Sequence, residues 1–251
     1  MNIDTIIVDL DRTLLNTDKT ISPYTAAVLK DCQKRAIRVI AATARPQRTA
    51  EPFCRTIPFD GMVVANGARI LFGGKKTEYG ICPQSARRFL DALALFPDLT
   101  VTLETGDCAY SNRPVADYET VICKDMSAIV KAEGALKILV HIDSPQTLAI
   151  VKKELTEDLY CTLAHGYLLQ IMDRSATKWN GIQEILRACN SSPNRTAYFG
   201  DDFDDLEPIQ KCGMGIAVAN AIAEVKAAAD CIADTNDQDG VARFIEQHFI
   251  K

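Results

Sequence analysis

The sequence predicts a doubly wound α/β fold, built on a mainly parallel sheet, with an inserted α+β domain. At both ends of the chain, short apolar runs alternate with amphipathic segments, which indicates strands covered on both faces by helices. In the middle, helical segments stand beside paired strands joined by turn residues. The 251 residues are enough for both parts. We expect the core to span residues 1–82 and 173–251, and the inserted domain to span residues 83–172.

The first elements alternate between strand and helix. Residues 5–8 are all β-branched and run straight into Asp9. Ser22 and Pro23 are typical of a helix N-cap followed by the first helical position, and this helix should end near Arg35. We predict core strands at residues 5–8, 37–42 and 62–65, and a hairpin arm at residues 68–72, between two turn signals.

The inserted domain and the second half of the core follow. We predict strand pairs at 100–104 with 108–111 and at 159–164 with 167–172, joined by turns at Gly106-Asp107 and His165-Gly166, with a further strand at 136–142. After Lys178 the alternation resumes, with strands at 196–199 and 214–218 and helices at 179–189, 221–228 and 241–248. An acidic loop, residues 200–205, follows the first of these strands.

Composition and charge argue against several classes of function. The net charge of −5 and pI near 5.3 argue against a nucleic-acid or anionic-membrane partner, which would call for a basic face. No apolar run approaches the ~20 residues that span a bilayer, and no basic segment precedes an apolar run at the N-terminus, so we expect no signal peptide. The nine cysteines form no C-x-x-C, which predicts neither a zinc site nor a redox motif. Their odd number fits reduced thiols, and we expect a cytoplasmic protein.

Polar side chains follow three of the predicted core strands. Asp9 and Asp11 follow the first strand, Thr43 follows the second, and the acidic loop follows the later strand at 196–199. Ligands of an open parallel sheet bind beyond the carboxyl ends of its strands. If these strand ends are neighbours, at least three carboxylates share one spot, where a divalent cation with oxygen ligands would neutralise them. Magnesium suits such a site.

This arrangement predicts phosphoryl transfer. A carboxylate can attack phosphorus and form an acyl phosphate that water later cleaves, and Asp9 would be that nucleophile. Asp11, two residues on, would protonate the leaving alcohol and later accept a proton from water. Thr43 and Lys178 would hold the non-bridging oxygens of the phosphoryl group.

Four motifs in order resemble the haloacid dehalogenase superfamily. The segment DLDRTLL, from Asp9, looks like its first motif, D-x-D-x-T. Thr43-Ala44-Arg45 resembles the second motif, Lys178 the third, and GDDFDD, from Gly200, the fourth, which is usually G-D-x-x-N-D. Asn66-Gly67-Ala68 and MGIAVANA, from Met214, are similar to segments of the Cof-like branch, whose cap domain lies between the second and third motifs.

The resemblance implies roles for these residues. Asp9 would be nucleophile and metal ligand, and Asp11 would be acid/base and lend its backbone carbonyl to the metal. Asp201 would be the third protein ligand, and Asp205 would orient metal-bound water or Lys178. The residues expected to bind the substrate are Thr43, Ala44, Arg45 and Lys178. For Arg45 two other interpretations stay open, a capping role and a place on the surface before Pro46.

Three positions depart from the pattern of the superfamily. Arg12 stands where glycine is common and puts a large cation beside the site. Ala44 replaces the usual glycine after Thr43, and Asp204 replaces asparagine. The added charge of Asp204 would either tighten metal binding or repel an anionic substrate.

We therefore predict a Mg²⁺-dependent phosphatase acting on a small phosphorylated metabolite, with sugar phosphates as the favoured class. A phosphomutase of the same superfamily and a non-catalytic sugar-phosphate-binding protein are the alternatives. The inserted domain would be a cap that sets specificity, with candidate residues in the segment 110–118 and around His165. The other histidines, His141 and His248, have no metal-ligand spacing, and we expect structural roles for all three.

Overall fold

The computed structural model describes residues 3–164 and 166–250, and the chain forms two compact units. Unit 1 comprises Met1–Thr77 and Thr177–Lys251, and unit 2 comprises Glu78–Ala176. The boundaries between the units therefore follow Thr77 and Ala176, a few residues away from the boundaries expected after residues 82 and 172. The segment from Glu78 joins unit 2 because Ile81 is buried in the core of that unit and donates its amide to the Ala135 carbonyl at 2.8 Å.

Unit 1 is built on an eight-stranded sheet in the order β14-β13-β12-β1-β2-β3-β4-β5. Neighbours from β14 to β3 run parallel, and β4 turns back antiparallel to β3. This order confirms the predicted doubly wound sheet. Its strands are β1 (Thr5–Val8), β2 (Arg38–Ala42), β3 (Gly61–Val64), β4 (Arg69–Phe72), β5 (Lys75–Glu78), β12 (Thr196–Gly200), β13 (Met214–Val218) and β14 (Cys231–Ala233).

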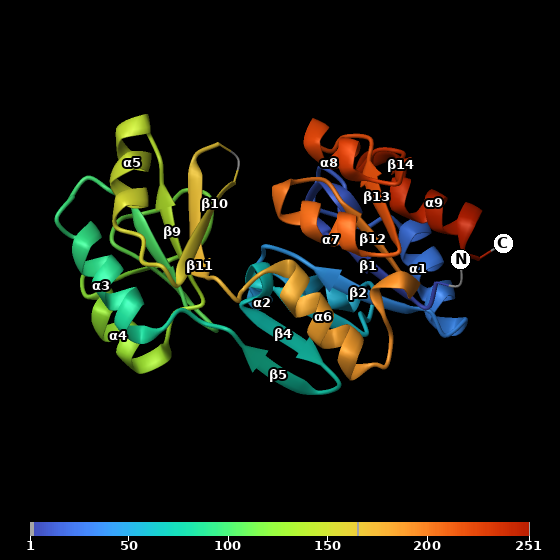
Figure 1. Ribbon diagram of the computed structural model, residues 1–251, viewed down its shortest axis with the longest axis horizontal. Helices are drawn as coiled ribbons and strands as arrows, with labels where there is room; N and C mark the ends of the chain where they lie inside the picture. The colour runs from blue at the N-terminus through green and yellow to red at the C-terminus, as the bar shows by residue number, and fades with distance from the viewer. Residues whose placement is uncertain (1–2, 165, 251) are drawn as a thin grey trace. The chain divides into compact units, whose positions relative to one another are not determined.

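Helices cover the unit 1 sheet (Figure 1). The first begins as its sequence predicts, since the Ser22 hydroxyl accepts a hydrogen bond from the Thr25 amide at 3.0 Å and Pro23 takes the first helical position. Helix α1 packs against α9, whereas α6 packs against α7 and against β3 and β4. The helices are α1 (Pro23–Lys34), α2 (Gln47–Ala50), α6 (Lys178–Ala188), α7 (Leu206–Lys211), α8 (Ala223–Ala228) and α9 (Gly240–His248).

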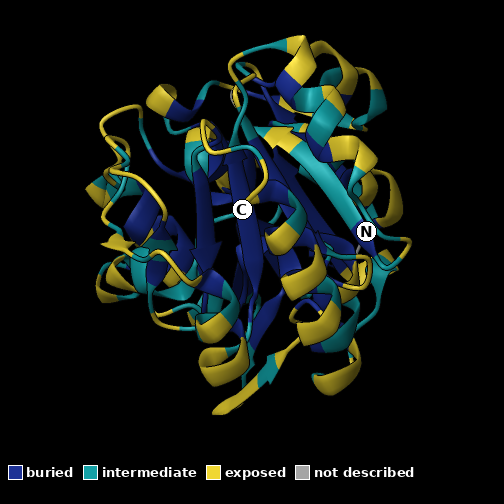
Figure 2. Cartoon of the chain, turned by 90° about the vertical axis from the view of Figure 1, so that its left-hand side faces the viewer, coloured by how far each residue is buried: buried dark blue, intermediate teal, exposed yellow. Residues whose placement is uncertain are grey.

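The core of unit 1 lies on both faces of this sheet. The β1 residues Ile6, Ile7 and Val8 have no exposed surface, so side chains that point to opposite faces are equally buried. This accounts for the unbroken apolar run in the sequence. Figure 2 colours the whole chain by burial, with buried strands in dark blue and exposed residues of the helices in yellow.

Unit 2 contains a six-stranded sheet in the order β10-β11-β9-β6-β7-β8. All described pairings are antiparallel except that of β7 with β8, and three helices lie along one face (Figure 1). The predicted turn residue His165 lies outside the described residues. The elements are α3 (Pro83–Leu93), β6 (Val101–Glu104), β7 (Ala109–Ser111), β8 (Val121–Ile122), α4 (Met126–Glu133), β9 (Lys137–His141), α5 (Pro145–Lys153), β10 (Leu159–Ala164) and β11 (Leu168–Asp173).

Strands β5, β8 and β14 were not predicted. The residues of β5 are polar and mostly exposed, and β8 and β14 have two and three residues, too few to show a periodic pattern. Some predicted boundaries were also wrong. Ala65 was expected to end the third strand but begins a tight turn with φ 51°, and Ala221 was expected to begin a helix that begins at Ala223. In the described part of the chain, no helix combines the length and apolar character that crossing a bilayer requires.

Gly67 gives a test of the packing within unit 1. Its φ is +102°, and a Cβ there would lie 2.1 Å from the carbonyl oxygen of Thr177, the N-cap of α6. We expect Gly67→Ala to lower the free energy of unfolding by roughly 2–5 kcal/mol, since strain and overpacking add. Gly73→Ala is the matched control, because φ is +58° there but no atom lies within 4 Å of the Cβ, and it should cost about 1 kcal/mol. Equal losses in urea unfolding would contradict the packing argument.

Candidate active site

The carboxyl ends of three parallel strands bring the predicted polar residues together. Strand β1 lies between β12 and β2, with Val8 paired to Phe199 on one side and to Ala41 on the other. Asp9 directly follows Val8, and its amide donates to the Phe199 carbonyl at 3.0 Å. Asp201, which follows β12, and Thr43, which follows β2, therefore lie on either side of Asp9, as the parallel pairing of these strands requires.

Three carboxylates gather at this edge of the sheet. Asp9, Asp201 and Asp205 each offer an oxygen within 4.8 Å of the others, and all three residues are buried. The ammonium of Lys178, the first residue of α6, lies 2.7 Å from an oxygen of Asp9 and 2.7 Å from an oxygen of Asp205. Lys178 is itself only 5% exposed, so this is a buried ion-pair network.

Burial dominates the electrostatics of the cluster. It raises the pKa of Asp9 well above its ordinary value, although the Lys178 charge opposes the shift. Burial, followed by the negative charge of Asp205, raises the pKa of Asp201 to about 7. Burial would lower the pKa of Lys178, but the Asp205 and Asp9 carboxylates outweigh it and hold that pKa well above the ordinary value. The lysine is therefore a fixed positive charge close to Asp9 and Asp201, two acids that resist ionisation.

Hydrogen bonds hold two of the carboxylates in place. Both oxygens of Asp205 are engaged, one by Lys178 and the Tyr198 hydroxyl and the other by the backbone amides of Asp201 and Asp202 at 2.9 and 3.1 Å. Asp201 accepts one bond, from the Thr13 hydroxyl at 2.9 Å. The donor set suits a hard divalent cation, because three carboxylates, once ionised, would carry more negative charge than the one buried ammonium of the cluster balances.

Two residues of the cluster's surroundings were not predicted. Thr13 is the threonine of D-x-D-x-T, so the first motif itself contains the signal for it. Tyr198 lies within β12 and is fully buried, and its sequence context is that of an ordinary core residue. Its contact with Asp205 depends on the sharp turn after β12.

The carboxylate of Asp11 lies in a different environment. Arg45 holds it in a bidentate ion pair, with Nε 2.6 Å from Oδ2 and Nη2 2.7 Å from Oδ1, and Lys19 Nζ lies 2.8 Å from Oδ1. Burial would raise the pKa of Asp11, but the hydrogen bonds and charges of Arg45 and Lys19 outweigh it and lower that pKa. Asp11 therefore carries a full negative charge in this arrangement.

The segment after β2 forms a bend at Ala44 and Arg45. The hydroxyl of the buried Thr43 accepts a hydrogen bond from the Arg45 amide at 3.1 Å. The guanidinium of Arg45 contacts Asp11, an interaction that none of the three interpretations from the sequence included.

Arg12 adopts a left-handed conformation with φ 61°, a region that favours glycine. Its half-exposed side chain places Nε 3.8 Å from Asp201 Oδ2. Its backbone carbonyl accepts a hydrogen bond from the Asn220 side chain at 2.7 Å, which fixes this conformation. Asp204, the acidic departure from the pattern, accepts a hydrogen bond from the side-chain amide of Asn66.

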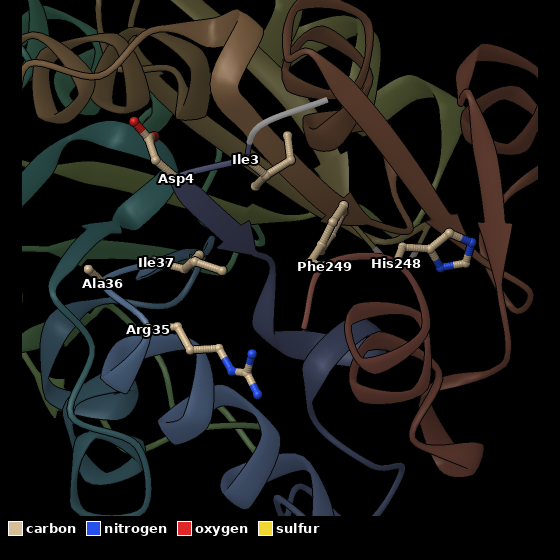
Figure 3. Close-up of a pocket in the computed structure, with 7 residues that line it drawn as sticks. All are labelled: Ile3, Asp4, Arg35, Ala36, Ile37, His248 and Phe249. Atoms are coloured by element: carbon tan, nitrogen blue, oxygen red, sulfur yellow. The ribbon is translucent and has the colours of Figure 1, made fainter. Parts of the chain in front are cut away.

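A separate pocket of about 370 Å³ lies at the opposite end of the unit 1 sheet (Figure 3). Its lining residues precede β1 and β2 or end the C-terminal helix, so they lie at the amino ends of the strands. They include none of the residues predicted for the site. The lining residues are Ile3, Asp4, Arg35, Ala36, Ile37, His248 and Phe249.

The raised pKa of Asp201 predicts a pH dependence of stability. An acid whose pKa is higher in the folded than in the unfolded chain binds more protons when folded, so its contribution to stability is lost as pH rises from about 4 to about 7. Asn at this position cannot ionise. Without divalent ions, Asp201→Asn should therefore gain about 2 kcal/mol relative to the original protein between pH 5 and pH 8.

Urea unfolding in a chelator at the two pH values would measure this gain. Asp98→Asn is the matched control, because the Asp98 side chain is 99% exposed, and it should show no such change. A constant difference between Asp201→Asn and the original protein at both pH values would show that Asp201 ionises normally.

Comparisons with known proteins agree with this site. Residues 6–245 match the family model of haloacid dehalogenase-like hydrolases. The chain is 26% identical to a Haemophilus influenzae protein provisionally named a phosphatase, and 24% identical to 5-amino-6-(5-phospho-D-ribitylamino)uracil phosphatase YitU of Bacillus subtilis, each match covering 97% of both chains. A solved sugar phosphatase of haloacid dehalogenase subclass IIB superposes with a TM-score of 0.84 at 17% identity, covering 97% of this chain and 98% of that chain. This chain therefore belongs to the haloacid dehalogenase-like hydrolases and is a phosphatase.

Proposed function

We propose that this phosphatase depends on Mg²⁺ and hydrolyses small phosphomonoesters through an aspartyl-phosphate on Asp9. The observation that carries the proposal is the buried group of Asp9, Asp201 and Asp205 around Lys178, at the carboxyl ends of parallel strands. Such an edge is where an open α/β sheet binds its ligand. A metal bound there would neutralise the carboxylates and bring the substrate phosphate to Asp9.

The reaction has two displacements at phosphorus. In the first, a carboxylate oxygen of Asp9 attacks, the bond to the leaving oxygen breaks, and Asp11 gives the leaving alcohol a proton. In the second, water attacks the acyl phosphate, Asp11 takes its proton, and the bond from phosphorus to Asp9 breaks to release orthophosphate. Lys178 and Thr43, with the backbone at Ala44 and Arg45, stabilise the charge on the non-bridging oxygens.

Asp11 needs a proton before it can act as an acid, and its present partners oppose this. The bidentate pair with Arg45 and the contact with Lys19 both favour the ionised carboxylate. We infer that Arg45 leaves Asp11 when a phosphate binds, because its guanidinium can form an equivalent bidentate pair with phosphate oxygens. Arg45 would then bind the substrate, and Asp11 would be released to take up a proton.

The side chains of Asp9 and Asp201 would ligate the metal, together with the backbone carbonyl of Asp11. Asp205 fits the positioning role better than that of a direct ligand, because both of its oxygens already accept hydrogen bonds. It holds Lys178 and the backbone amide of Asp201 in place.

Unit 2 is the proposed cap domain that selects the leaving group. The relatives named above act on a ribitylamino uracil phosphate and on sugar phosphates, and we propose a small phosphorylated metabolite of the sugar-phosphate class here. Nucleic acid remains an unfavoured partner on charge grounds. All nine cysteines are free thiols, which supports the proposed cytoplasmic location.

A panel of phosphorylated metabolites, assayed for phosphate release with and without Mg²⁺, tests the proposal directly. We expect Asp9→Asn to lower phosphate release by about a thousandfold or more, because the nucleophile is lost. Asp98→Asn changes the same charge at an exposed site and should retain full activity. Mg²⁺-dependent activity that survives Asp9→Asn would refute the mechanism, and an isomerised sugar phosphate in place of released phosphate would indicate a mutase.

Arg12 should weaken metal binding, because its charge lies beside the proposed ligand Asp201. We expect Arg12→Gly to lower the Mg²⁺ dissociation constant about two- to fivefold, the effect of one partly exposed charge. Arg12→Lys keeps the charge and should bind Mg²⁺ as the original protein does. Titration calorimetry without substrate measures both, and unchanged or weaker binding by Arg12→Gly would contradict the argument.

A further inference from the structure

Tyr198 carries a buried hydroxyl that takes no part in the two displacements at phosphorus. Its neighbour in β12, Phe199, lies on one face of the sheet, where its ring meets the Phe244 ring of α9 edge to face at a centroid distance of 5.7 Å. Successive side chains of a strand point to opposite faces, so Tyr198 points to the other face. There its hydroxyl donates to Asp205, which also binds Lys178 at the start of α6.

Packing alone does not account for this hydroxyl. Tyr198 has no exposed surface, and the other residues of β12 are buried as well, so a phenylalanine ring would fill the same space. A buried hydroxyl costs free energy unless it is hydrogen-bonded, which makes phenylalanine the simpler residue for stability. The hydroxyl donates to Oδ1 of Asp205, so its role is to be sought at that carboxylate.

Both oxygens of the Asp205 carboxylate are held, but by groups of different rigidity. Oδ2 accepts the amides of Asp201 and Asp202, which belong to the same turn. Oδ1 accepts Lys178, whose four-carbon side chain is flexible, and Tyr198, whose ring is packed inside a strand between two others. A flexible ammonium moves with the oxygen that it binds, whereas a packed ring holds that oxygen in place. The Tyr198 hydroxyl is therefore the group that fixes Oδ1.

The two ion pairs of Lys178 fix the direction of its third N–H. An ammonium has three N–H donors, arranged tetrahedrally about Nζ together with the bond to the side chain. Two of them point to Oδ1 of Asp9 and Oδ1 of Asp205, both at 2.7 Å, and this sets the direction of the third. Because Asp9 is the proposed nucleophile, the third N–H lies beside the carboxylate that would receive the phosphoryl group. An oxygen of that group can accept it.

Movement of Asp205 Oδ1 would turn the ammonium away from this direction. Misplacing a group by about 1 Å can cost on the order of a hundredfold in rate, since the transition state needs charge at a defined point. Binding of the substrate phosphate is less sensitive, because the metal and the backbone at Ala44 and Arg45 would also hold it. A loosened Asp205 should therefore slow the reaction more than it weakens binding.

We propose that Tyr198 is a positioning residue for phosphoryl transfer: its hydroxyl fixes Oδ1 of Asp205, and Asp205 thereby directs an N–H of Lys178 to the phosphoryl group. The proposal rests on the proposed function and extends it to a residue that does not touch the substrate. The contacts that carry it lie wholly within unit 1.

Tyr198→Phe, which deletes the hydroxyl and keeps the ring, tests the proposal in the full enzyme with Mg²⁺. For a phosphomonoester that the panel shows to be hydrolysed, we expect kcat to fall about tenfold and KM to stay within about twofold. Tyr24→Phe is the matched control, because the Tyr24 hydroxyl also donates to a carboxylate of unit 1, that of Glu246, at 2.7 Å. It should leave kcat unchanged. A hydroxyl with a merely structural role would lower the unfolding temperature and leave kcat unchanged below it.

Two oxyanions give a readout that needs no turnover. Orthovanadate adopts the five-coordinate geometry of the transition state, whereas orthophosphate is the product. Titration calorimetry with Mg²⁺ should show that Tyr198→Phe weakens orthovanadate binding about tenfold and orthophosphate binding less than about twofold. Tyr24→Phe should bind both as the original protein does.

A double-mutant cycle tests whether Tyr198 acts through Asp205. Asp205→Asn removes the charge that holds Lys178, so adding Tyr198→Phe to it should lower kcat less than about twofold further. A tenfold loss in both backgrounds would show that Tyr198 acts independently of Asp205 and would overturn the proposal. If circular dichroism shows that Asp205→Asn does not fold, the kcat and oxyanion measurements on Tyr198→Phe decide alone.

Three further results would overturn the proposal while the proposed function stands. They are an unchanged kcat in Tyr198→Phe, a rise of KM that accounts for the whole loss, and equal losses of affinity for the two oxyanions. Failure of Tyr198→Phe to fold would show that the hydroxyl is structural, which also contradicts the proposal.

If the original protein releases no phosphate from any compound of the panel, the proposed function fails instead. The oxyanion titrations then decide. A selective loss of orthovanadate affinity in Tyr198→Phe would support the positioning of Lys178 by Tyr198, and affinities equal to those of Tyr24→Phe would exclude it.

Discussion

The ion pairs of Lys178 with Asp9 and Asp205 are the constraint on which the site depends. Each of these charges is buried, and removing one member of a buried pair leaves the others uncompensated at a cost of about 3–5 kcal/mol. The three residues come from the end of β1, the start of α6 and the turn after β12, so this network fixes the relative positions of elements far apart in the chain. When its three carboxylates are ionised, the cluster carries more negative charge than Lys178 balances. A metal ion can supply the missing positive charge and can also attract the phosphate of a substrate.

The two predicted catalytic aspartates differ because their surroundings differ. Asp9 is buried beside other carboxylates, whereas Asp11, two residues along the chain, is paired with two cations at a partly exposed position. Two identical side chains thereby acquire opposite pKa shifts, so that Asp9 binds a proton more readily than a free aspartate and Asp11 less readily. Arg45 links these environments to the substrate, since its guanidinium can pair with a carboxylate or a phosphate but not with both at full strength.

Much of the fold and the location of the site were predictable from residue patterns. Buried β-branched runs predicted parallel strands, and the meeting of their carboxyl ends explains why Asp9 and Asp201 lie together. The partner of Arg45 could not be predicted, because it depends on the bend after Thr43. The sheet face that Thr162 and His141 share was also hidden, because the β10–β11 pair was predicted but its pairing with β9 was not. Pairings of this kind between distant strands leave no signal in a single sequence.

The junction at which the chain re-enters unit 1 has an evolutionary consequence. The backbone of Thr177 lies so close to Gly67 that no side chain fits between them, and Lys178 is the very next residue. The position of Lys178 is thus fixed by the contact between Gly67 and Thr177, which lies wholly inside unit 1. The sequence between residues 78 and 176 does not take part in this contact. A lineage could exchange that whole segment for another and acquire new specificity while inheriting its chemistry intact. Chimaeras that keep Gly67 and Thr177 would reproduce that history in the laboratory.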